Sequence, residues 1–181
     1  MIIFFGPAGS GKSVQGQMLA AKNGWNWLSM GELLRDTSDK EIQEFMKTGQ
    51  LVPNDKTNQI LSEKLVDIGD SNKVIIDGYP RHLDQAEWLV DNQVKYGYLL
   101  NLAIVIDVPK DELLKRLSLR GRSDDNMESI EKRLQIYSSE TYPILEYLGV
   151  QGVKVAHIDG LGTKEQIHER VLKKLSECDL I

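Results

Sequence analysis

One stretch constrains this chain more than any other: the glycine-rich loop GPAGSGKS (Gly6–Ser13), which directly follows the apolar run Ile2–Phe5. It fits the pattern G-x-x-x-x-G-K-[ST], in which glycines let successive backbone N–H groups point at phosphate oxygens. The pattern requires a strand before the loop and a helix after it, and the flanking residues suit both. We therefore expect Lys12 to reach the β- and γ-phosphates of a nucleoside triphosphate and the Ser13 hydroxyl to contact Mg²⁺.

Four more short apolar runs are predicted to be strands: Trp25–Leu28, Val74–Ile76, Leu102–Ile106 and Val153–Ile158. Most of their residues are apolar without alternation, which is typical of parallel strands covered on both faces. Amphipathic helical patterns lie between the runs. The alternation predicts an α/β domain with a parallel sheet and right-handed crossovers, whose ligands bind at the carboxyl ends of the strands.

Two helices are predicted from the C-terminal third of the chain. Apolar residues at three- and four-residue steps predict a helix that Pro143 should kink or interrupt. Its stripe consists of Met127, Ile130, Leu134, Tyr137, Thr141 and Leu145. Thr163 followed by Gln166 predicts a capping box at the start of the last helix. The buried face of that helix is expected to carry Ile167, Val171 and Leu175.

The charge balance and the cysteine count exclude several function classes. The 181 residues carry a net charge of -5, without the basic excess of a protein that binds nucleic acid or an anionic membrane. Cys178 is the only cysteine, so neither an internal disulfide nor a cysteine zinc cluster is expected. The first residues lack the regions of a signal peptide, and no apolar run is long enough to span a membrane. We expect a cytoplasmic monomer.

Charged residues stand where phosphoryl chemistry needs them. The run Val74–Ile76 ends in Asp77, whose carboxylate is expected to hold Mg²⁺ through water. Phosphoryl transfer also needs positive charge around the transferring group, and a bidentate guanidinium suits phosphate oxygens. The arginines considered for this task are Arg35, Arg81, Arg116, Arg120, Arg122 and Arg133.

Several motifs in order resemble the adenylate kinase family of nucleoside monophosphate kinases. They are GPAGSGKSVQ, SMGELLR (Ser29–Arg35), TGQLVP (Thr48–Pro53), DGYPR (Asp77–Arg81) with Gln85, RLSLRGRSDDN (Arg116–Asn126) and EKR (Glu131–Arg133). The resemblance covers nearly the whole chain. It implies a three-layer phosphate-loop NTPase fold, with a five-stranded parallel sheet and helices on both faces. It also implies one kinase domain, with a core at residues 1–28, 54–119 and 127–181, an acceptor-binding segment at 29–53 and a very short lid at 120–126.

The resemblance implies roles for individual residues. ATP would lie over Gly9, Ser10, Gly11, Lys12, Ser13 and Val14, with Arg116 stacked on its adenine and the Gly162 backbone on the other side of the base. The residues that would bind the acceptor monophosphate are Met30, Arg35, Gln50, Leu51, Val52, Gly78, Tyr79, Pro80, Arg81, Gln85, Arg122 and Arg133. Among them, Gln85 would pair with the exocyclic amine and the N1 edge of adenine. The catalytic residues would be Lys12, Arg81, Arg120, Arg122 and Arg133, with Mg²⁺ at Ser13 and Asp77 and no zinc.

The chain departs from the family pattern at three places. Ser13 and Val14 stand where the family usually has Gly and Thr, so the Mg²⁺ contact is expected at Ser13. Met30 replaces a Thr or Ala, which makes the acceptor pocket narrower and more apolar. Only residues 121–123 separate Arg120 from the acidic pair Asp124 and Asp125, so the lid is shorter than the usual short form.

The predicted reaction is the reversible transfer of the γ-phosphoryl group of ATP to AMP, which gives two ADP. A UMP/CMP kinase is the alternative, because changes in a single pocket are worth only about a few kcal/mol in discrimination between acceptor bases. SMGELLR, GQLVP and Gln85 argue against a kinase of a small metabolite, which needs no base pocket. A nucleotide-binding regulator without transfer activity is a further alternative, which only the short lid favours.

Overall fold

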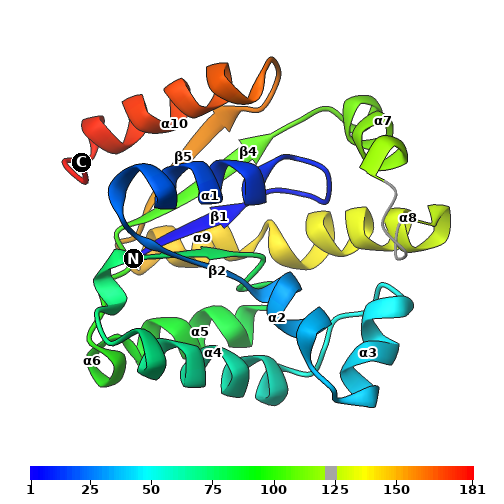
Figure 1. Cartoon of the computed structure of the whole chain (residues 1–181), viewed down its shortest axis with the longest axis horizontal. Helices are drawn as coiled ribbons and strands as arrows, with labels where there is room; N and C mark the ends of the chain where they lie inside the picture. Colours follow the sequence, from blue (N-terminus) through cyan, green and yellow to red (C-terminus); the bar gives the residue numbers. More distant parts are fainter. Residues whose placement is uncertain (121–125) are drawn as a thin grey trace.

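The computed structural model describes residues 1–120 and 126–181. A parallel sheet of five strands lies at its centre, in the order β2-β3-β1-β4-β5 (Figure 1). The strands are β1 (Ile2–Phe5), β2 (Asn26–Ser29), β3 (Val74–Asp77), β4 (Leu102–Asp107) and β5 (Lys154–Asp159). All five predicted runs are strands, with ends shifted by at most one residue. The predicted α/β fold class is therefore confirmed.

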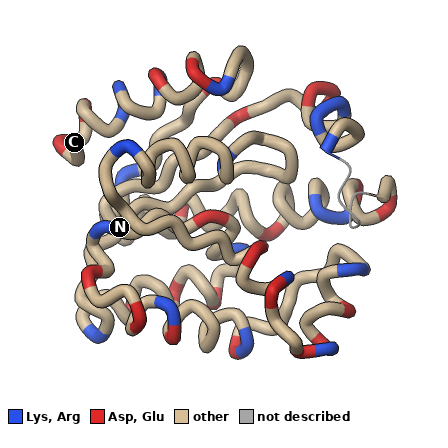
Figure 2. The backbone as a smooth tube through the Cα atoms, viewed as in Figure 1, with Lys and Arg blue, Asp and Glu red and all other residues tan. Residues whose placement is uncertain are grey.

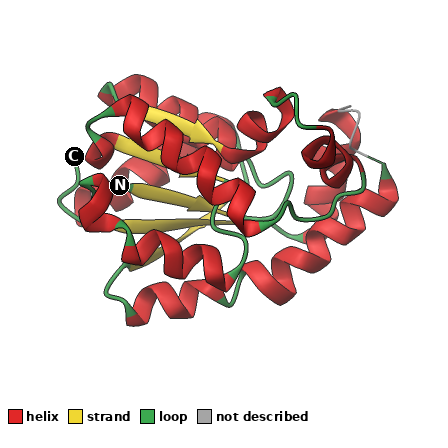
Figure 3. Ribbon diagram, turned by 90° about the horizontal axis from the view of Figure 1, so that it is seen from below, coloured by secondary structure: helices red, strands yellow, loops and turns green. Residues whose placement is uncertain are grey.

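Helices pack against both faces of the sheet (Figures 1 and 3). One face is covered by α1 (Lys12–Asn23) and α10 (Lys164–Glu177). The other face is covered by α4 (Asn54–Ile68), α5 (Leu83–Asp91) and α9 (Ile144–Val150). The remaining elements are α2 (Met30–Asp36), α3 (Lys40–Lys47), a 3₁₀ turn η1 (Ser71–Lys73), α6 (Gln93–Tyr96), α7 (Lys110–Arg120), α8 (Met127–Ile136) and a π-helical turn η2 (Tyr137–Thr141).

The core divides into two clusters because successive side chains of a strand point to opposite faces of the sheet. In β1, Ile2 and Phe4 pack with α1 and α10, whereas Ile3 and Phe5 pack with α4, α5 and α9. All four side chains are at least 97% buried. Both faces of the central strand are therefore apolar, as its continuous run of apolar residues predicts.

The predicted helix interruption at Pro143 is confirmed. Before this proline, α8 ends at Ile136 and continues as the π-helical turn η2, in which the Tyr142 N–H donates to the Tyr137 carbonyl at 2.8 Å. Met127, at the start of the predicted stripe, lies in α8 but is 60% exposed. It occupies the first turn of α8, which extends beyond the sheet, so the core cannot cover it.

The predicted start of α10 is also confirmed. The Thr163 hydroxyl accepts from the Gln166 N–H, and the Gln166 side chain accepts from the Thr163 N–H at 2.9 Å. This reciprocal capping satisfies two of the N–H groups that every helix start leaves unpaired. The expected buried face, Ile167, Val171 and Leu175, packs on the sheet.

Charged residues of both signs are interspersed along the helices, as Figure 2 shows. Within residues 1–120 and 126–181, no helix combines the length and the apolar character that a membrane crossing needs.

Candidate active site

The loop between β1 and α1 has the conformation that phosphate binding requires. Gly9 has a φ of 86° and Gly11 has a φ of 95°, in the left-handed region that favours glycine. A Cβ atom at Gly9 would lie 3.0 Å from Leu117 Cγ and 3.2 Å from the Leu113 carbonyl oxygen, so a larger residue would push α7 away. Lys12 Nζ donates to the Pro7 carbonyl at 3.4 Å, which folds the lysine back over the loop. This geometry of the loop and the start of α1 can accommodate an anion.

Ser13 and Asp77 form a pair at the carboxyl end of the sheet. The Ser13 hydroxyl donates to Asp77 Oδ2, across the gap between α1 and the end of β3. Asp77 is 2% exposed, and its second oxygen, Oδ1, is buried without a hydrogen-bond partner among the described residues. Hydroxyl and carboxylate oxygens are the ligands that Mg²⁺ prefers, so a buried orphan oxygen beside Ser13 fits a magnesium site. Among the residues that the structure describes, we assign only Ser13 and Asp77 to this magnesium site.

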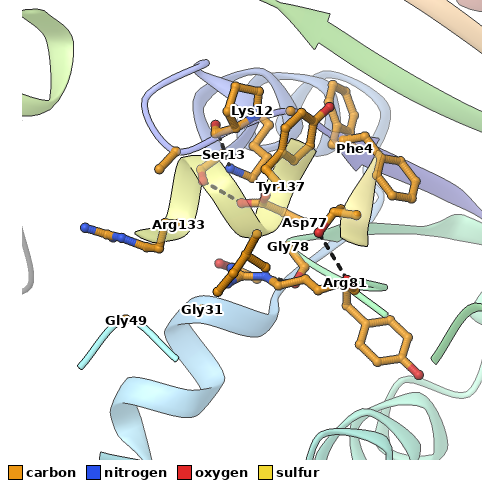
Figure 4. Close-up of a pocket in the computed structure, with 18 of the residues that line it drawn as sticks. Phe4, Lys12, Ser13, Gly31, Gly49, Asp77, Gly78, Arg81, Arg133 and Tyr137 are labelled. Atoms are coloured by element: carbon orange, nitrogen blue, oxygen red, sulfur yellow. Dashed lines mark hydrogen bonds between the residues drawn. The ribbon is translucent and has the colours of Figure 1, made fainter. Parts of the chain in front are cut away.

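A central cleft opens next to this pair and brings together most of the predicted phosphoryl-transfer residues. Its volume is about 120 Å³. Figure 4 shows Lys12, Ser13 and Asp77 in it, with Gly31 of α2, Gly78, Arg81 and Arg133 around them. The predicted site residues that line it are Lys12, Ser13, Arg35, Gln50, Asp77, Gly78, Tyr79, Pro80, Arg81, Arg120 and Arg133.

Backbone groups hold two of these arginines in place. Arg81 Nε donates to the Gly78 carbonyl at 2.9 Å, and the Arg81 carbonyl accepts from Thr141 Oγ1 at 3.1 Å. Arg133 Nε donates to the Ser129 carbonyl at 3.1 Å, one turn earlier in α8. A planar guanidinium carries N–H donors in a fixed fork, a geometry that matches phosphate oxygens.

A second pocket, here called the side pocket, lies on the α10 side of the loop, with a volume of about 410 Å³. It shares Lys12, Ser13 and Arg120 with the central cleft. The other predicted site residues that line it are Gly9, Gly11, Val14, Arg116 and Gly162. The two pockets therefore meet at the phosphate loop.

Two hydrogen bonds fix the orientation of the Arg116 guanidinium at the side pocket. Its Nε donates to Glu112 Oε1 at 2.8 Å, and its Nη2 donates to the Gly160 carbonyl at 2.9 Å. The guanidinium holds the pKa of the Glu112 carboxyl below its ordinary value, mainly through this hydrogen bond. A cationic plane clamped between α7 and the loop after β5 can stack on a flat aromatic base.

A third pocket, here called the apolar pocket, adjoins the central cleft on the α2 and α4 side. The predicted residues that line it are Met30, Gln50, Leu51, Val52, Gly78, Tyr79, Arg81 and Gln85. Met30, Val52 and Tyr79 are each at least 97% buried, so the pocket is largely apolar. The side chains of Gln50, Thr57, Arg81 and Gln85 provide its polar groups. Its volume is about 20 Å³, so a nucleobase beside the charged cleft could enter it only if the surrounding segments moved apart.

Among the described residues, one predicted site residue, Ser10, does not line these pockets. Ser10 is fully buried, with its hydroxyl facing Gly6, where a Cβ atom would lie 2.5 Å from it. Only its backbone remains for a ligand, because the tight turn of the loop directs the side chain inward. Arg122, predicted to bind the acceptor and to be catalytic, lies outside the described residues, as do Asp124 and Asp125.

Several residues at these pockets escaped the sequence analysis. Tyr137 of η2 lines the central cleft, and burial, with a smaller contribution from Asp107, raises the pKa of its hydroxyl. Gln15 lies within the quoted motif GPAGSGKSVQ, is 1% exposed, and joins α1 to α10 through His168 and the Lys164 carbonyl. Thr57, with Leu61 and Leu65, belongs to the buried stripe of α4. The polar Thr57 within this otherwise apolar stripe is the signal from which the sequence analysis could have identified it.

Comparisons with known proteins agree with this geometry. Residues 4–153 match the family model described as "Adenylate kinase". A curated adenylate kinase of Thermus thermophilus is 36% identical, with 94% of each chain covered. One of Bacteroides fragilis is 38% identical, with 95% of this chain and 96% of the relative covered. One of Mycolicibacterium paratuberculosis is 35% identical, with 97% and 99% covered.

Proposed function

Because the chain belongs to the adenylate kinase family, we propose that it is a phosphotransferase that moves the γ-phosphoryl group of ATP reversibly to AMP, giving two ADP. The observation that carries this proposal is the meeting of the central cleft and the side pocket at Lys12, Ser13 and Arg120. Two phosphorylated ligands bound in these pockets would face each other end to end. This is the arrangement that in-line transfer between two nucleotides requires.

In this proposal the donor occupies the side pocket. Its phosphates lie over the loop, where backbone N–H groups and Lys12 bind them, and its base stacks on Arg116 opposite the Gly162 backbone. The contacts of Arg116 with Glu112 and Gly160 support this role, because they hold the guanidinium before a ligand arrives. Preorganisation reduces the ordering cost of binding.

The acceptor occupies the central cleft and the apolar pocket. We propose that Arg35 and Arg81 bind its phosphate and that Met30, Gln85 and the backbone of residues 50–52 bind its base. The acceptor oxygen is already anionic, so the reaction needs no general base. Lys12, Arg81, Arg120 and Arg133 would stabilise the charge of the transferring group.

The proposed acceptor-binding segment, residues 29–53, corresponds to α2, α3 and the loop that follows them. The Ser129 hydroxyl donates to the Lys47 carbonyl at 3.3 Å, which joins this segment to α8 on the opposite side of the cleft. Contact between this segment and α8 would close the cleft and exclude water from the reaction. The proposed lid, residues 120–126, includes residues 121–125, which the structure does not describe.

We assign Mg²⁺ to Ser13 and Asp77, the latter through water. When bound, the ion neutralises charge on the donor phosphates and so favours their transfer. The buried, unpartnered Asp77 Oδ1 supports the assignment. In this chain the hydroxyl oxygen for Mg²⁺ comes from Ser13, whereas in the family it usually comes from a Thr at the position of Val14.

We also propose that the protein acts as a cytoplasmic monomer whose partners are nucleotides. One free cysteine is consistent with a reducing compartment.

A turnover panel tests the function. Purified protein with MgATP is offered AMP, dAMP, UMP, CMP or GMP, beside a control without acceptor. We expect ADP formation with AMP as the best acceptor and little hydrolysis without one. Lys12→Ala should lower turnover about 10²-fold or more, because it removes a fixed positive charge at the phosphates. Lys22→Ala, at the other end of α1, should retain activity. Preference for a pyrimidine acceptor would favour the UMP/CMP kinase alternative, and nucleotide binding without turnover would favour the regulator.

A further inference from the structure

The loop after β5 carries the carbonyl that holds Arg116 at the side pocket, and Arg170 of α10 contacts the same loop. Arg170 Nη1 donates to the Asp159 carbonyl at 2.7 Å and to the Leu161 carbonyl at 2.6 Å. A terminal guanidinium nitrogen carries two hydrogens, so these contacts use both of them. The Gly160 carbonyl, between the two, accepts from Arg116 Nη2 at 2.9 Å. Three successive carbonyls of the loop therefore join α10 to α7.

The peptide between Asp159 and Gly160 is held at both of its polar groups. In a trans peptide the C=O and the N–H point in opposite directions. Here the C=O accepts from Arg170, and the N–H donates to the Asp107 carbonyl at 2.8 Å, at the end of β4. Arg170 and β4 together set the rotation of this peptide plane.

The next peptide, between Gly160 and Leu161, presents the carbonyl that accepts from Arg116. Its N–H donates to Asp159 Oδ1 at 3.0 Å. Gly160 joins the two peptide planes without a side chain, so its backbone restricts their relative rotation little. A larger residue does not fit there, because its Cβ atom would lie 2.5 Å from Val108 Cγ2. The loop therefore needs contacts from outside itself to keep the Gly160 carbonyl toward Arg116.

The N–H groups of Arg170 matter more here than its charge. Its ion pair with Asp159 Oδ2 is long, at 3.8 Å, and the two side chains are 40% and 60% exposed. Such exposed pairs are worth little in water. The two contacts with backbone carbonyls are short and charge-assisted, which makes them the stronger interactions.

We propose that Arg170 is a positioning residue for the donor base. By holding the carbonyls on either side of Gly160, it keeps the Gly160 carbonyl toward Arg116, whose guanidinium stacks on the base. Arg170 is not among the residues that line the side pocket, so it acts through the loop. This inference rests on the proposed function, in which the side pocket binds ATP. The effect of Arg170 falls on the base of the donor, and neither the triphosphate nor the acceptor depends on it.

Binding of two ligands in the absence of acceptor measures this effect. MgATP carries the base, whereas inorganic triphosphate with Mg²⁺ has only the phosphate chain. Calorimetry should show that Arg170→Ala weakens ATP binding about 3- to 12-fold, the effect of losing one hydrogen bond, and leaves triphosphate binding within about twofold of the wild type. In steady-state kinetics the KM for ATP should rise by a similar factor, with kcat and the KM for AMP unchanged. Unchanged ATP binding, or equal weakening of both ligands, would overturn the proposal.

Removal of Arg116 tests whether Arg170 acts through it. In an Arg116→Ala protein the Gly160 carbonyl has already lost its donor, so adding Arg170→Ala should change ATP binding by less than about twofold. A loss as large as in the wild-type background would overturn the proposal, because Arg170 would then act without Arg116. Failure of the wild type to bind ATP, or unchanged ATP binding by Arg116→Ala alone, would instead refute the donor site of the proposed function.

Two control variants separate the carbonyl contacts from charge. Asp159→Asn removes the ion pair but keeps a side-chain oxygen for the loop. Lys174→Ala removes a cation one turn later in α10, where Lys174 pairs with Glu177 at 2.6 Å. Both should bind ATP as the wild type does, and a loss in either equal to that of Arg170→Ala would contradict the mechanism. If Arg170→Ala does not fold, Arg170→Met keeps the apolar stem of the side chain and should give the same selective loss of ATP binding.

Discussion

Gly160, in the loop after β5, couples the packing of the core to the proposed donor site. A Cβ atom at this position would lie 2.5 Å from Val108 Cγ2, 2.6 Å from Ile106 Cγ2 and 3.0 Å from the Asp107 carbonyl oxygen. The backbone of Gly160 is also fixed on both sides. Its N–H donates to the Asp107 carbonyl at 2.8 Å, and its carbonyl accepts from Arg116. Gly160→Ala must therefore displace either the sheet edge or the loop that holds Arg116.

The expected magnitude follows from this overpacking. Forcing one methyl group into a filled core costs about 1–3 kcal/mol, and a chain of this length loses about 2–4 °C in Tm for each kcal/mol. Gly160→Ala should thus lower the Tm by roughly 2–12 °C. If the loop moves, Arg116 loses a hydrogen bond of about 0.5–1.5 kcal/mol, so the KM for ATP should rise about 2- to 12-fold. The KM for AMP should stay the same.

Thermal unfolding and steady-state kinetics with each nucleotide varied in turn measure both effects. Gly149→Ala is the matched control, since a Cβ there meets nothing within 4 Å inside α9. It should leave both KM values unchanged and raise stability by up to about 1 kcal/mol, the helix preference of Ala over Gly. A Gly160→Ala protein with unchanged Tm and unchanged KM for ATP would refute the reasoning. Equal increases in both KM values would refute the assignment of the side pocket to the donor.

Two further predictions concern α8 and α10. Arg133→Ala should lower kcat about 10²- to 10³-fold if the Arg133 guanidinium stabilises the transferring group. Lys132→Ala removes the same charge from the neighbouring position and should change kcat little. Equal kcat values for the two variants would contradict the proposed role of Arg133. Burial, followed by the charge of Lys22, lowers the pKa of His168 below its usual 6.5. The unfolded chain therefore takes up this proton at a higher pH than the folded chain, and stability should fall as the pH drops below about 6.5. Unfolding in denaturant at pH 8 and pH 5 should show a smaller loss for His168→Gln than for the wild type, and an equal loss would remove His168 from the explanation.

Most of the fold was predictable because its signals are local. Continuous apolar runs gave all five strands, Thr163 and Gln166 gave the start of α10, and Pro143 marked the break between η2 and α9. Helical spacing placed Met127 on the same stripe as Ile130, but it shows which residues share a face and not where the core ends, and Met127 is exposed. The strand order places β3 between β1 and β2, so that Asp77 lies beside the loop.

The candidate site was predictable to the extent that its residues belong to motifs. The structure brings Lys12, Asp77 and Arg81 to one cleft although they are far apart in the sequence. The hydrogen-bond partners of Gln85 could not be predicted, since contacts between α4 and α5 depend on how the helices pack.

The proposed transfer between two nucleotides is tested most directly by following the phosphoryl group itself. ATP labelled at the γ-phosphate is mixed with unlabelled AMP, Mg²⁺ and the purified protein, and the products are separated. We predict that the label appears in the β-phosphate of ADP and that two ADP form for each ATP consumed. Label released as inorganic phosphate, or retained in ATP at all protein concentrations, would contradict the assignment of this chain as an adenylate kinase.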